Sequence, residues 1–453
     1  MSAVSAEIEL QQLPWITTPQ RKGVFSMLRF WPRPASTKDK HTIELALLQS
    51  GGIAASTPQT AGATAPNSDD VVAELLDVDI DDKGNYIHTL AIRQSANAST
   101  PSTANASTPS TANASTPSTA NEPPKTARHS LVMTHGYFTG LGYYFRNFKE
   151  LACVDGWDVY AIDWLGMGRS ARPAYTSNRT SDEARVRGAE AFFVESLEEW
   201  RKRVGIDKMT LCGHSFGGYM SALYALKYPE RVEKLVLVSP IGLPEQPPDF
   251  DERLRQGYGP ARNRKDPKTQ DSTPEYESAD VDADADAKPG ELATPSRMRI
   301  MFFRTAMGLW ERNYTPQGIV RTAGPFGRRL INWYVSRFSW LTDAQRNSLS
   351  EYAHQISTLP GSSEYALGDI LRPGAFARQP LINRIGNIAV PTVFMYGEND
   401  WVDHTSGQQA MRRIGDKVAT SLYRIPAAGH NLHLENPVDF NKFLIDEMRT
   451  VGK

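Results

Sequence analysis

The feature that most constrains the fold is a serine between two glycines at the end of an apolar stretch, the G-x-S-x-G motif of residues 213–217. The motif follows the pattern of a buried strand over residues 209–213 and precedes the pattern of a helix. Gly213 and Gly217 let strand and helix approach closely around a sharp turn, because they lack a Cβ atom. Such a turn projects the hydroxyl of Ser215 clear of both elements. Ser215 is therefore the candidate nucleophile.

The same turn predicts where the negative charge of a reaction intermediate would be stabilised. The backbone amide of Phe216 lies at the first turn of the helix, where an unpaired N–H and the helix dipole favour an oxyanion. A second donor is expected from the loop after the strand Leu131–Thr134, where His135 and Gly136 precede Tyr137. The amides of Tyr137 and Phe216 are thus the predicted oxyanion-hole donors. His135 itself is expected to shape the turn.

A serine hydroxyl needs a general base and an acid that orients the base, and candidates for both come late in the chain. Asp400 and Asp403 follow the strand Thr392–Tyr396, and His430 follows the strand Ser421–Ile425. The order serine, aspartate, histidine, with acid and base just past strand ends, is that of the α/β-hydrolase triad. His430 is the predicted base. Asp400 is the preferred acid and Asp403 the alternative, because either can reach the imidazole from the same loop.

Apolar strands alternate with helical patterns along much of the chain. This alternation predicts an α/β fold with a mostly parallel, doubly wound sheet. One of the intervening helices is expected around Ala184–Arg203. The expected strands are Tyr86–Gln94, Ser130–His135, Trp157–Asp163, Met209–Gly213, Leu235–Ser239, Thr392–Gly397 and Ser421–Ile425.

The composition is that of a globular enzyme. The chain has 453 residues, 40% of them hydrophobic, which suffices for one large α/β domain with insertions. A formal net charge of −1 gives no general attraction to nucleic acid. No apolar run reaches the roughly 18 residues that span a bilayer, so membrane contact is expected to be peripheral. Two cysteines, Cys153 and Cys212, cannot form a disulfide framework, which favours a reducing compartment.

Two low-complexity stretches interrupt the alternation. Residues 97–120 are three tandem copies of Asn-Ala-Ser-Thr-Pro-Ser-Thr-Ala, which cannot pack a core. We expect residues 95–125 to form a surface loop. Residues 247–295 include an alternating Asp-Ala run, but the glycine and the closing glutamate of a calcium-binding loop are missing. A solvated acidic loop is therefore expected, and no metal site.

Residues 297–388 change to aromatic-rich amphipathic helices without a clear strand, at the place where such folds carry a lid. A helical cap with an apolar face that supplies an acyl groove is the prediction. Near the N-terminus, aromatic and cationic residues interleave from Trp15 to Arg33, which suits a membrane surface and equally suits plain packing. The predicted division is an N-terminal extension with this candidate membrane-surface segment (1–70), the first part of the core (71–243), the acidic insertion and cap (244–389), and the second part of the core (390–453).

Together these motifs resemble a lipid-enzyme family of the α/β-hydrolase fold. The family includes N-acylphosphatidylethanolamine lysophospholipase, the co-activator of adipose triglyceride lipase and the fungal cardiolipin-specific deacylase. The resemblance extends from about Leu131 to the C-terminus without the acidic insertion. The motifs that carry it are His135-Gly136, the D-x-x-G-x-G-x-S turn of Asp163–Ser170, Phe192–Arg201, Gly213–Gly217, Gly324–Gly327 and the stretch from Tyr396 to Asp403.

The resemblance implies a serine hydrolase of phospholipase or deacylase type that cleaves acyl esters of membrane phospholipids, with cardiolipin as the first candidate substrate. The co-activator branch lacks the nucleophilic serine, whereas this chain has Ser215. Some members carry an H-x-x-x-x-D motif linked to acyltransfer onto lysophosphatidic acid, and here Glu435 stands five residues after His430. A lysophosphatidic acid acyltransferase and a non-catalytic lipid-droplet co-activator are the alternatives.

The expected partners and location follow from the same resemblance. A phospholipid substrate and peripheral contact with a membrane surface are expected. No cofactor and no nucleic-acid partner are expected, and protein partners are left open. The expected location is intracellular, at the mitochondrial inner membrane or the lipid-droplet surface, and otherwise in the cytoplasm.

Overall fold

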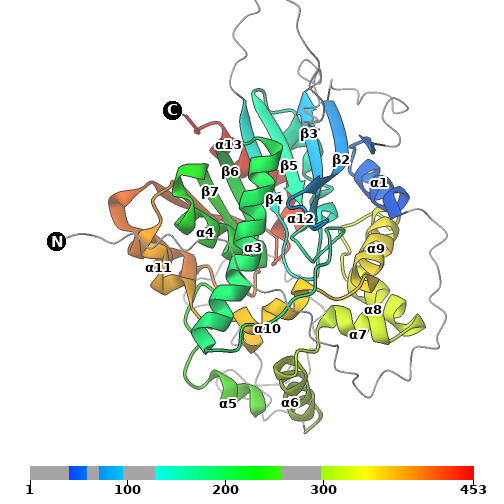
Figure 1. The fold of residues 1–453 in the computed structure, drawn as a ribbon, viewed down its shortest axis with the longest axis vertical. Helices are drawn as coiled ribbons and strands as arrows, with labels where there is room; N and C mark the ends of the chain where they lie inside the picture. Colours follow the sequence, from blue (N-terminus) through cyan, green and yellow to red (C-terminus); the bar gives the residue numbers. More distant parts are fainter. Residues whose placement is uncertain (1–39, 59–70, 95–127, 257–296, 453) are drawn as a thin grey trace, which may run out of the picture. The chain divides into compact units, whose positions relative to one another are not determined.

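A nine-stranded sheet forms the centre of the described chain (Figure 1). The structure is a computed structural model, and it describes residues 40–58, 71–94, 128–256 and 297–452. The strands are β1 (Ala55–Ser56), β2 (Val71–Asp79), β3 (Tyr86–Gln94), β4 (His129–Thr134), β5 (Trp157–Ile162), β6 (Met209–His214), β7 (Val232–Val238), β8 (Thr392–Gly397) and β9 (Thr420–Ile425).

The sheet is mostly parallel, as the alternation predicts. Its strand order is β1-β2-β3-β5-β4-β6-β7-β8-β9. The six strands from β5 to β9 in that order pair in parallel, whereas β2 pairs antiparallel with β3, and β3 with β5. The carboxyl ends of β6, β7 and β8 therefore lie next to one another, and this edge is where ligands bind in open α/β sheets.

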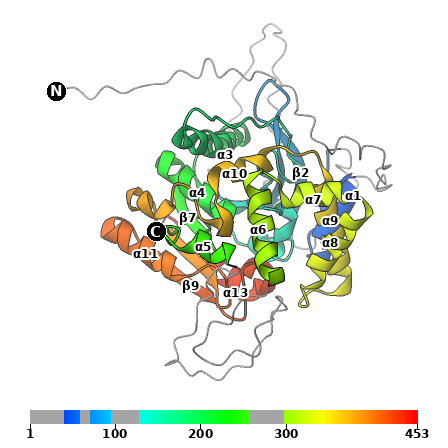
Figure 2. The same cartoon turned by 90° about the horizontal axis from the view of Figure 1, so that it is seen from below.

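Helices cover both faces of the sheet (Figures 1 and 2). Along β4 the side chain of Val132 packs on one face, while Leu131 and Met133 pack on the other, so both faces are apolar. One face buries α3 (Asp182–Val204), α4 (Phe216–Lys227) and α11 (Thr405–Ile414). The opposite face buries α1 (Lys40–Ser50), α2 (Phe148–Ala152) and α13 (Pro437–Met448).

Local sequence explains where the long helix α3 begins and ends. The hydroxyl of Ser181 accepts a hydrogen bond from the amide of Ala184, and two acidic residues follow in the first turn. Basic residues occupy the last turn, and Gly205 ends the helix with φ 80°, a left-handed conformation that glycine adopts without strain. The prediction of a helix around Ala184–Arg203 is confirmed.

Between β7 and β8 the described chain is helical. Its helices are α5 (Phe250–Arg255), α6 (Arg297–Glu311), α7 (Pro316–Thr322), α8 (Pro325–Ser336), α9 (Asp343–Thr358) and α10 (Leu367–Ile370). Helix α9 begins with a capping box in which Thr342 and Gln345 bond each other's backbone amides. Helices α7, α8 and α9 pack on one another, and α9 also packs on α1. We use "cap" for residues 297–370.

Some sequence predictions differ from the structure or fall outside it. Residues 1–70 were assigned to an extension, yet α1 packs on the sheet and β1 pairs with β2. Helix α5 lies within the range 247–295, for which only a loop was expected. The aromatic and cationic segment from Trp15 to Arg33, the repeats of 97–120 and the Asp-Ala run lie outside the described residues. Within the described ranges, no helix is both long and apolar enough to cross a membrane.

Candidate active site

Ser215 stands on a strained turn between β6 and α4. Its backbone has φ 56° and ψ −114°, outside the regions that residues with a side chain normally adopt. A Cβ atom on Gly213 would lie 2.4 Å from the carbonyl oxygen of Gly217. A Cβ atom on Gly217 would lie 2.5 Å from the carbonyl oxygen of Thr134 on β4. The two glycines thus permit the close packing that holds the turn.

The structure brings His430 and Asp400 to this serine. The Nε2 atom of His430 lies 3.0 Å from Ser215 Oγ, and its Nδ1 atom lies 3.0 Å from Asp400 Oδ1. Asp400 follows β8 and His430 follows β9, so both come from loops at the carboxyl ends of parallel strands. This arrangement allows a proton to pass from the serine hydroxyl to the imidazole while the carboxylate fixes the ring.

Asp400 is held as a carboxylate. Its side chain is 1% exposed. Burial raises the pKa of Asp400, but the charge and hydrogen bond of His430, the Ser239 hydroxyl and the Val402 amide outweigh burial, and the net pKa is lowered. The Val402 amide donates to Oδ1 over 2.9 Å, and the Ser239 hydroxyl donates to Oδ2. A buried carboxylate with these donors stays ionised and can stabilise an imidazolium.

Asp403, the alternative acid, makes a different set of contacts. Its carboxylate accepts hydrogen bonds from the amide of Thr405 at 2.8 Å and from the hydroxyl of Thr405 at 2.7 Å, at the start of α11. Its side chain is 43% exposed. Of the two aspartates, Asp400 is therefore the one that lies against His430.

The two predicted oxyanion donors flank the serine. The amide of Phe216 begins α4 directly after Ser215. Gly136 lies against the elbow, because a Cβ atom built on it would be 3.1 Å from Ser215 Cβ. The backbone that continues from Gly136 into Tyr137 therefore runs beside the nucleophile. The hydroxyl of Thr139 donates to the Gly136 carbonyl at 2.8 Å and fixes this stretch.

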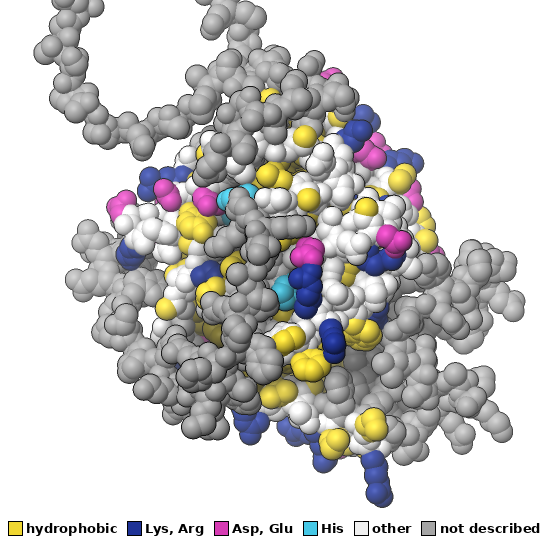
Figure 3. All heavy atoms as spheres, turned by 90° about the vertical axis from the view of Figure 1, so that its right-hand side faces the viewer, with side chains coloured by type: hydrophobic (Ala, Val, Ile, Leu, Met, Phe, Trp, Pro, Cys, Tyr) yellow, Lys and Arg dark blue, Asp and Glu magenta, His cyan; other side chains and the backbone are white. Residues whose placement is uncertain are grey.

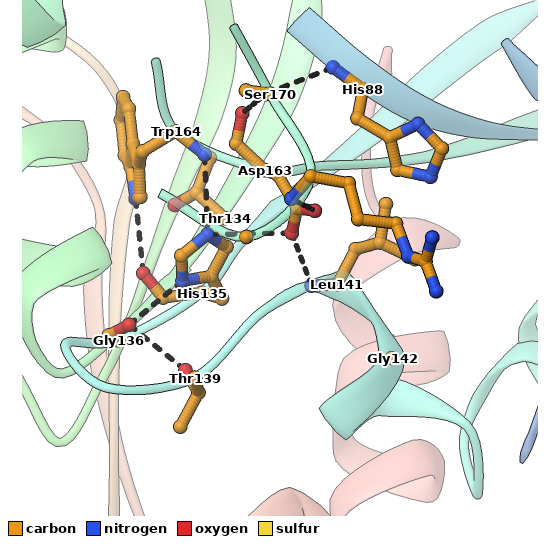
Figure 4. A network of polar contacts seen from close by, with 12 residues as sticks. His88, Thr134, His135, Gly136, Thr139, Leu141, Gly142, Asp163, Trp164 and Ser170 are labelled. Carbon is orange, nitrogen blue, oxygen red and sulfur yellow. Dashed lines mark hydrogen bonds and ion pairs between the residues drawn. The ribbon is translucent and has the colours of Figure 1, made fainter. Parts of the chain in front are cut away.

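A network around Asp163 holds that loop (Figure 4). The buried carboxylate accepts hydrogen bonds from the amides of Leu141 and Arg169, both at 2.7 Å. The amide of Trp164 donates to His135 Nε2 at 3.1 Å, so His135 Nδ1 carries the proton and donates to the Gly136 carbonyl at 2.7 Å. Burial lowers the pKa of His135, in keeping with this neutral ring. His135 therefore acts on the shape of the loop.

The same network continues into an ion-pair cluster that ties α1 to the sheet. Glu44, on α1, lies 2.9 Å from His88 Nε2 and 3.0 Å from Arg169 Nε. Burial lowers the pKa of His88, but the charge of Glu44 and hydrogen bonds to Asp77 and Glu44 raise it, to about 10 overall. One atom each of Glu44, His88 and Asp163 would fit around a metal ion. A protonated imidazole has no lone pair for a metal, so this cluster is better described as ion pairing.

The backbone of His430 is fixed on three sides. Glu435 accepts hydrogen bonds from the amide of Gly429 at 2.5 Å and from the amide of Asn431 at 3.1 Å. His214 Nε2 donates to the His430 carbonyl at 2.9 Å. Burial and the nearby His430 lower the pKa of His214 to about 3, so His214 stays neutral. Glu435 thus braces both neighbours of His430 in the chain.

Sequence reasoning gave no role to three residues that lie at the site. Ser239 was seen only as a strand end, although β7 lies between β6 and β8, which places its carboxyl end beside those of both. His214 was given no role of its own. Trp401 is 51% exposed, and its ring centre lies 4.8 Å from that of His430.

Comparison with known proteins shows the fold and the family of this chain. Residues 130–266 match the family model described as alpha/beta hydrolase fold. A 1-acylglycerol-3-phosphate O-acyltransferase of Arabidopsis thaliana is 35% identical over 329 residues, 71% of this chain and 66% of that protein. The 1-acylglycerol-3-phosphate O-acyltransferase ABHD5 of Homo sapiens is 30% identical, over 69% of this chain and 75% of that protein. The chain belongs to the lipid α/β-hydrolase family.

Members of this lipid α/β-hydrolase family carry names of more than one activity. A (lyso)-N-acylphosphatidylethanolamine lipase of Mus musculus is 28% identical, over 70% of this chain and 79% of that protein. The match spans about two thirds of the length of the plant relative. The names of these relatives thus include both acyltransferases and a lipase.

Proposed function

We propose that this chain is a serine hydrolase that cleaves acyl esters of membrane phospholipids, with Ser215 as nucleophile, His430 as general base and Asp400 as the orienting acid. One observation carries the proposal: the ring nitrogens of His430 lie 3.0 Å from Ser215 Oγ and 3.0 Å from Asp400 Oδ1. An imidazole between a hydroxyl and a buried carboxylate is the arrangement that turns serine into a nucleophile.

In the proposed reaction, His430 Nε2 accepts the hydroxyl proton while Ser215 Oγ bonds to the carbonyl carbon of the ester. The amides of Phe216 and Tyr137 donate to the oxyanion of the tetrahedral intermediate. His430 then passes the proton to the departing alkoxide, the ester C–O bond breaks, and the acyl group stays on Ser215. Water that loses a proton to His430 attacks this acyl-enzyme, and the fatty acid leaves as Ser215 regains its proton.

The proposed substrate is a phospholipid at a membrane surface. The lipase name of the mouse relative and the acylglycerol-phosphate names of the plant and human relatives support a lipid with a phosphate head group. Cardiolipin is our first candidate, on the resemblance to the fungal deacylase. The mitochondrial inner membrane and the lipid-droplet surface are the proposed places of action.

The test uses purified wild-type protein and the Ser215→Ala variant with mixed liposomes that contain cardiolipin and N-acylphosphatidylethanolamine. Mass spectrometry then follows each lipid class. We expect one lyso-lipid to appear with the wild-type protein, and the Ser215→Ala variant to lose about 10⁶-fold in kcat while it keeps its fold. Ser348→Ala, on α9, is the matched control and should retain activity. Equal lipid profiles for wild type and Ser215→Ala would reject the hydrolase and favour a non-catalytic co-activator.

The second candidate is acyl transfer to lysophosphatidic acid, and the names of the plant and human relatives favour it. In this chain Glu435, the residue at the place of the motif aspartate, braces the amides of Gly429 and Asn431. That contact supports a positioning role for Glu435. It does not determine whether water or a lyso-lipid accepts the acyl group.

Glu435→Gln distinguishes the two roles. We expect hydrolysis to fall about tenfold in kcat with KM unchanged, because one of the two amides loses its acceptor and His430 shifts. The assay measures fatty-acid release alongside consumption of acyl-CoA with lysophosphatidic acid. Serine-dependent consumption of acyl-CoA that exceeds fatty-acid release, and that Glu435→Gln abolishes while hydrolysis persists, would replace the hydrolase by the acyltransferase.

A further inference from the structure

Large apolar side chains gather on the outer surface of the cap. Of the nine exposed large hydrophobic residues within the described chain, seven lie between residues 297 and 337. A monomeric surface scatters such side chains singly, so this concentration marks an interaction surface. Six of them stand on the helices α6, α7 and α8: Met298, Met301, Ile319, Phe326, Leu330 and Trp333.

Helix α8 shows that this face is separate from the packing face. Its buried residues Gly327, Ile331 and Val335 recur every four positions and turn toward the neighbouring helices. Phe326, Leu330 and Trp333 form a second apolar stripe, with exposed fractions of 63%, 43% and 60%. A helix packed on one side needs no apolar stripe on its outer side unless something covers that side.

The charge of the same stretch points to what covers it. Residues 297–337 contain eight arginines and one glutamate, in a chain whose net charge is −1. Arg321 and Arg328 pair with glutamates outside the stretch. Guanidinium groups also lie directly over the exposed rings, Arg329 over Phe326 at 5.3 Å and Arg337 over Trp333 at 5.5 Å.

Figure 3 shows the side of the molecule that carries α7 and α8. In its lower half, hydrophobic and basic side chains lie side by side, and no acidic side chain is visible among them. Aromatic rings at the level of lipid head groups with cations beside them are the composition of a membrane-surface element. A protein partner would need acids placed to match each arginine, whereas an anionic bilayer meets them in any arrangement.

We propose that the outer face of α6, α7 and α8 docks on the surface of an anionic phospholipid bilayer. The docking face is defined by Met298, Met301, Ile319, Phe326, Leu330 and Trp333 with the surrounding arginines. The choice of a lipid as the binding partner rests on the proposed function. The position of the docking face rests only on the exposed side chains of the cap. The cap is inserted between β7 and β8, and Ser239 and Asp400 follow these two strands, so docking would hold the bilayer against the segment that joins them.

The experiment measures binding of the full chain to vesicles by flotation. Vesicles of phosphatidylcholine are compared with vesicles of phosphatidylcholine mixed with phosphatidylglycerol, at low and at physiological salt. One variant combines Phe326→Ser, Leu330→Ser and Trp333→Ser, and a second combines Arg329→Gln with Arg337→Gln. The matched control combines Val438→Ser with Arg449→Gln on and after α13, where both side chains are also well exposed. Thermal unfolding of each variant checks the fold, and Trp333→Ser alone replaces the triple variant if that variant unfolds.

We expect the wild-type protein and the control to bind the anionic vesicles and to bind neutral vesicles at least tenfold more weakly. The apolar variant should lose at least tenfold in affinity for anionic vesicles. Each arginine removed should cost roughly fivefold, and less as salt increases. Unchanged binding by both cap variants, or equal binding of wild type to neutral and anionic vesicles, would overturn the inference. Tight Ser215→Ala binding without any serine-dependent hydrolysis by wild type would reject the proposed function and leave the docking face standing.

Discussion

At the scale of single residues, the proposed nucleophile, the proposed base and the two elbow glycines can be recognised in the sequence because each belongs to a short local pattern. The choice between Asp400 and Asp403 cannot be predicted in this way, since both follow the same strand and both can turn toward an imidazole. A contact from elsewhere in the chain favours Asp400: the hydroxyl of Ser239, which follows β7, donates to its carboxylate. Such contacts depend on which strands are neighbours, which no local pattern contains.

Replacing Asp400 by asparagine tests this assignment. The variant keeps the size of the side chain but presents the wrong hydrogen-bonding group to His430 Nδ1, so kcat should fall about 10⁴-fold. Asp403→Asn is the matched control, because it changes the same chemistry three residues away, and it should stay within a few-fold of wild type. The measurement is turnover of a soluble short-chain ester. The opposite order of the two variants would make Asp403 the acid.

At the scale of elements, the expected strands and the long helix α3 lie close to those of the structure, because alternating apolar segments and end signals are strong there. Helix α1 and the strands β1 and β2 were missed. Part of what fixes α1 is the contact of Glu44 with His88, 44 positions later in the chain, which sequence patterns do not reveal. The close approach of β6 and α4 was predicted from the two glycines. The structure adds that β4 packs at the same place, because a Cβ atom on Gly217 would lie 2.5 Å from the Thr134 carbonyl oxygen.

Gly217→Ala should remove activity and lower stability. The added methyl would lie 2.5 Å from the Thr134 carbonyl and 2.7 Å from the His135 carbonyl, both on backbone that cannot yield cheaply. Gly188→Ala, within α3, is the control, since its methyl would meet nothing closer than 3.7 Å. We expect the control to gain up to about 1 kcal/mol in unfolding free energy, because alanine favours helix over glycine. Chemical denaturation measures the unfolding free energy of both variants. Equal unfolding free energies would contradict the steric argument.

At the scale of the whole molecule, the parallel sheet and a helical insertion between its two halves follow from the order of the motifs. The sequence does not predict the buried ion pairs that join α1, β3 and the turn of Asp163–Ser170. Buried charges are uncommon and leave no periodic signal. These pairs connect the first described helix with the turn whose Asp163 holds the loop of Tyr137, the proposed oxyanion donor. Loss of these ion pairs would therefore be expected both to lower the unfolding free energy and to disturb the loop beside Ser215.

The His88 pair predicts how global stability depends on pH. The pKa of His88 is about 10 in the folded chain against an ordinary value of 6.5, so the folded state binds the proton more tightly. Its contribution is complete below pH 6.5 and is lost as the pH rises toward about 10. Unfolding free energy should therefore fall over this range. In His88→Gln the fall should be shallower, and a parallel fall in both proteins would refute the assignment.

The hydrogen bond between Ser239 and Asp400 joins the two places where the chain leaves and re-enters the sheet. Ser239 ends the strand before the inserted helices, its amide also donates to the Met395 carbonyl at 2.8 Å, and Asp400 follows the strand after them. The insertion is thus closed at its base by the same bond that supports the acid. The segment between these two points can therefore change in length or sequence without moving the proposed catalytic groups, so the part of the chain that would select the lipid can vary independently of the residues that would cleave it.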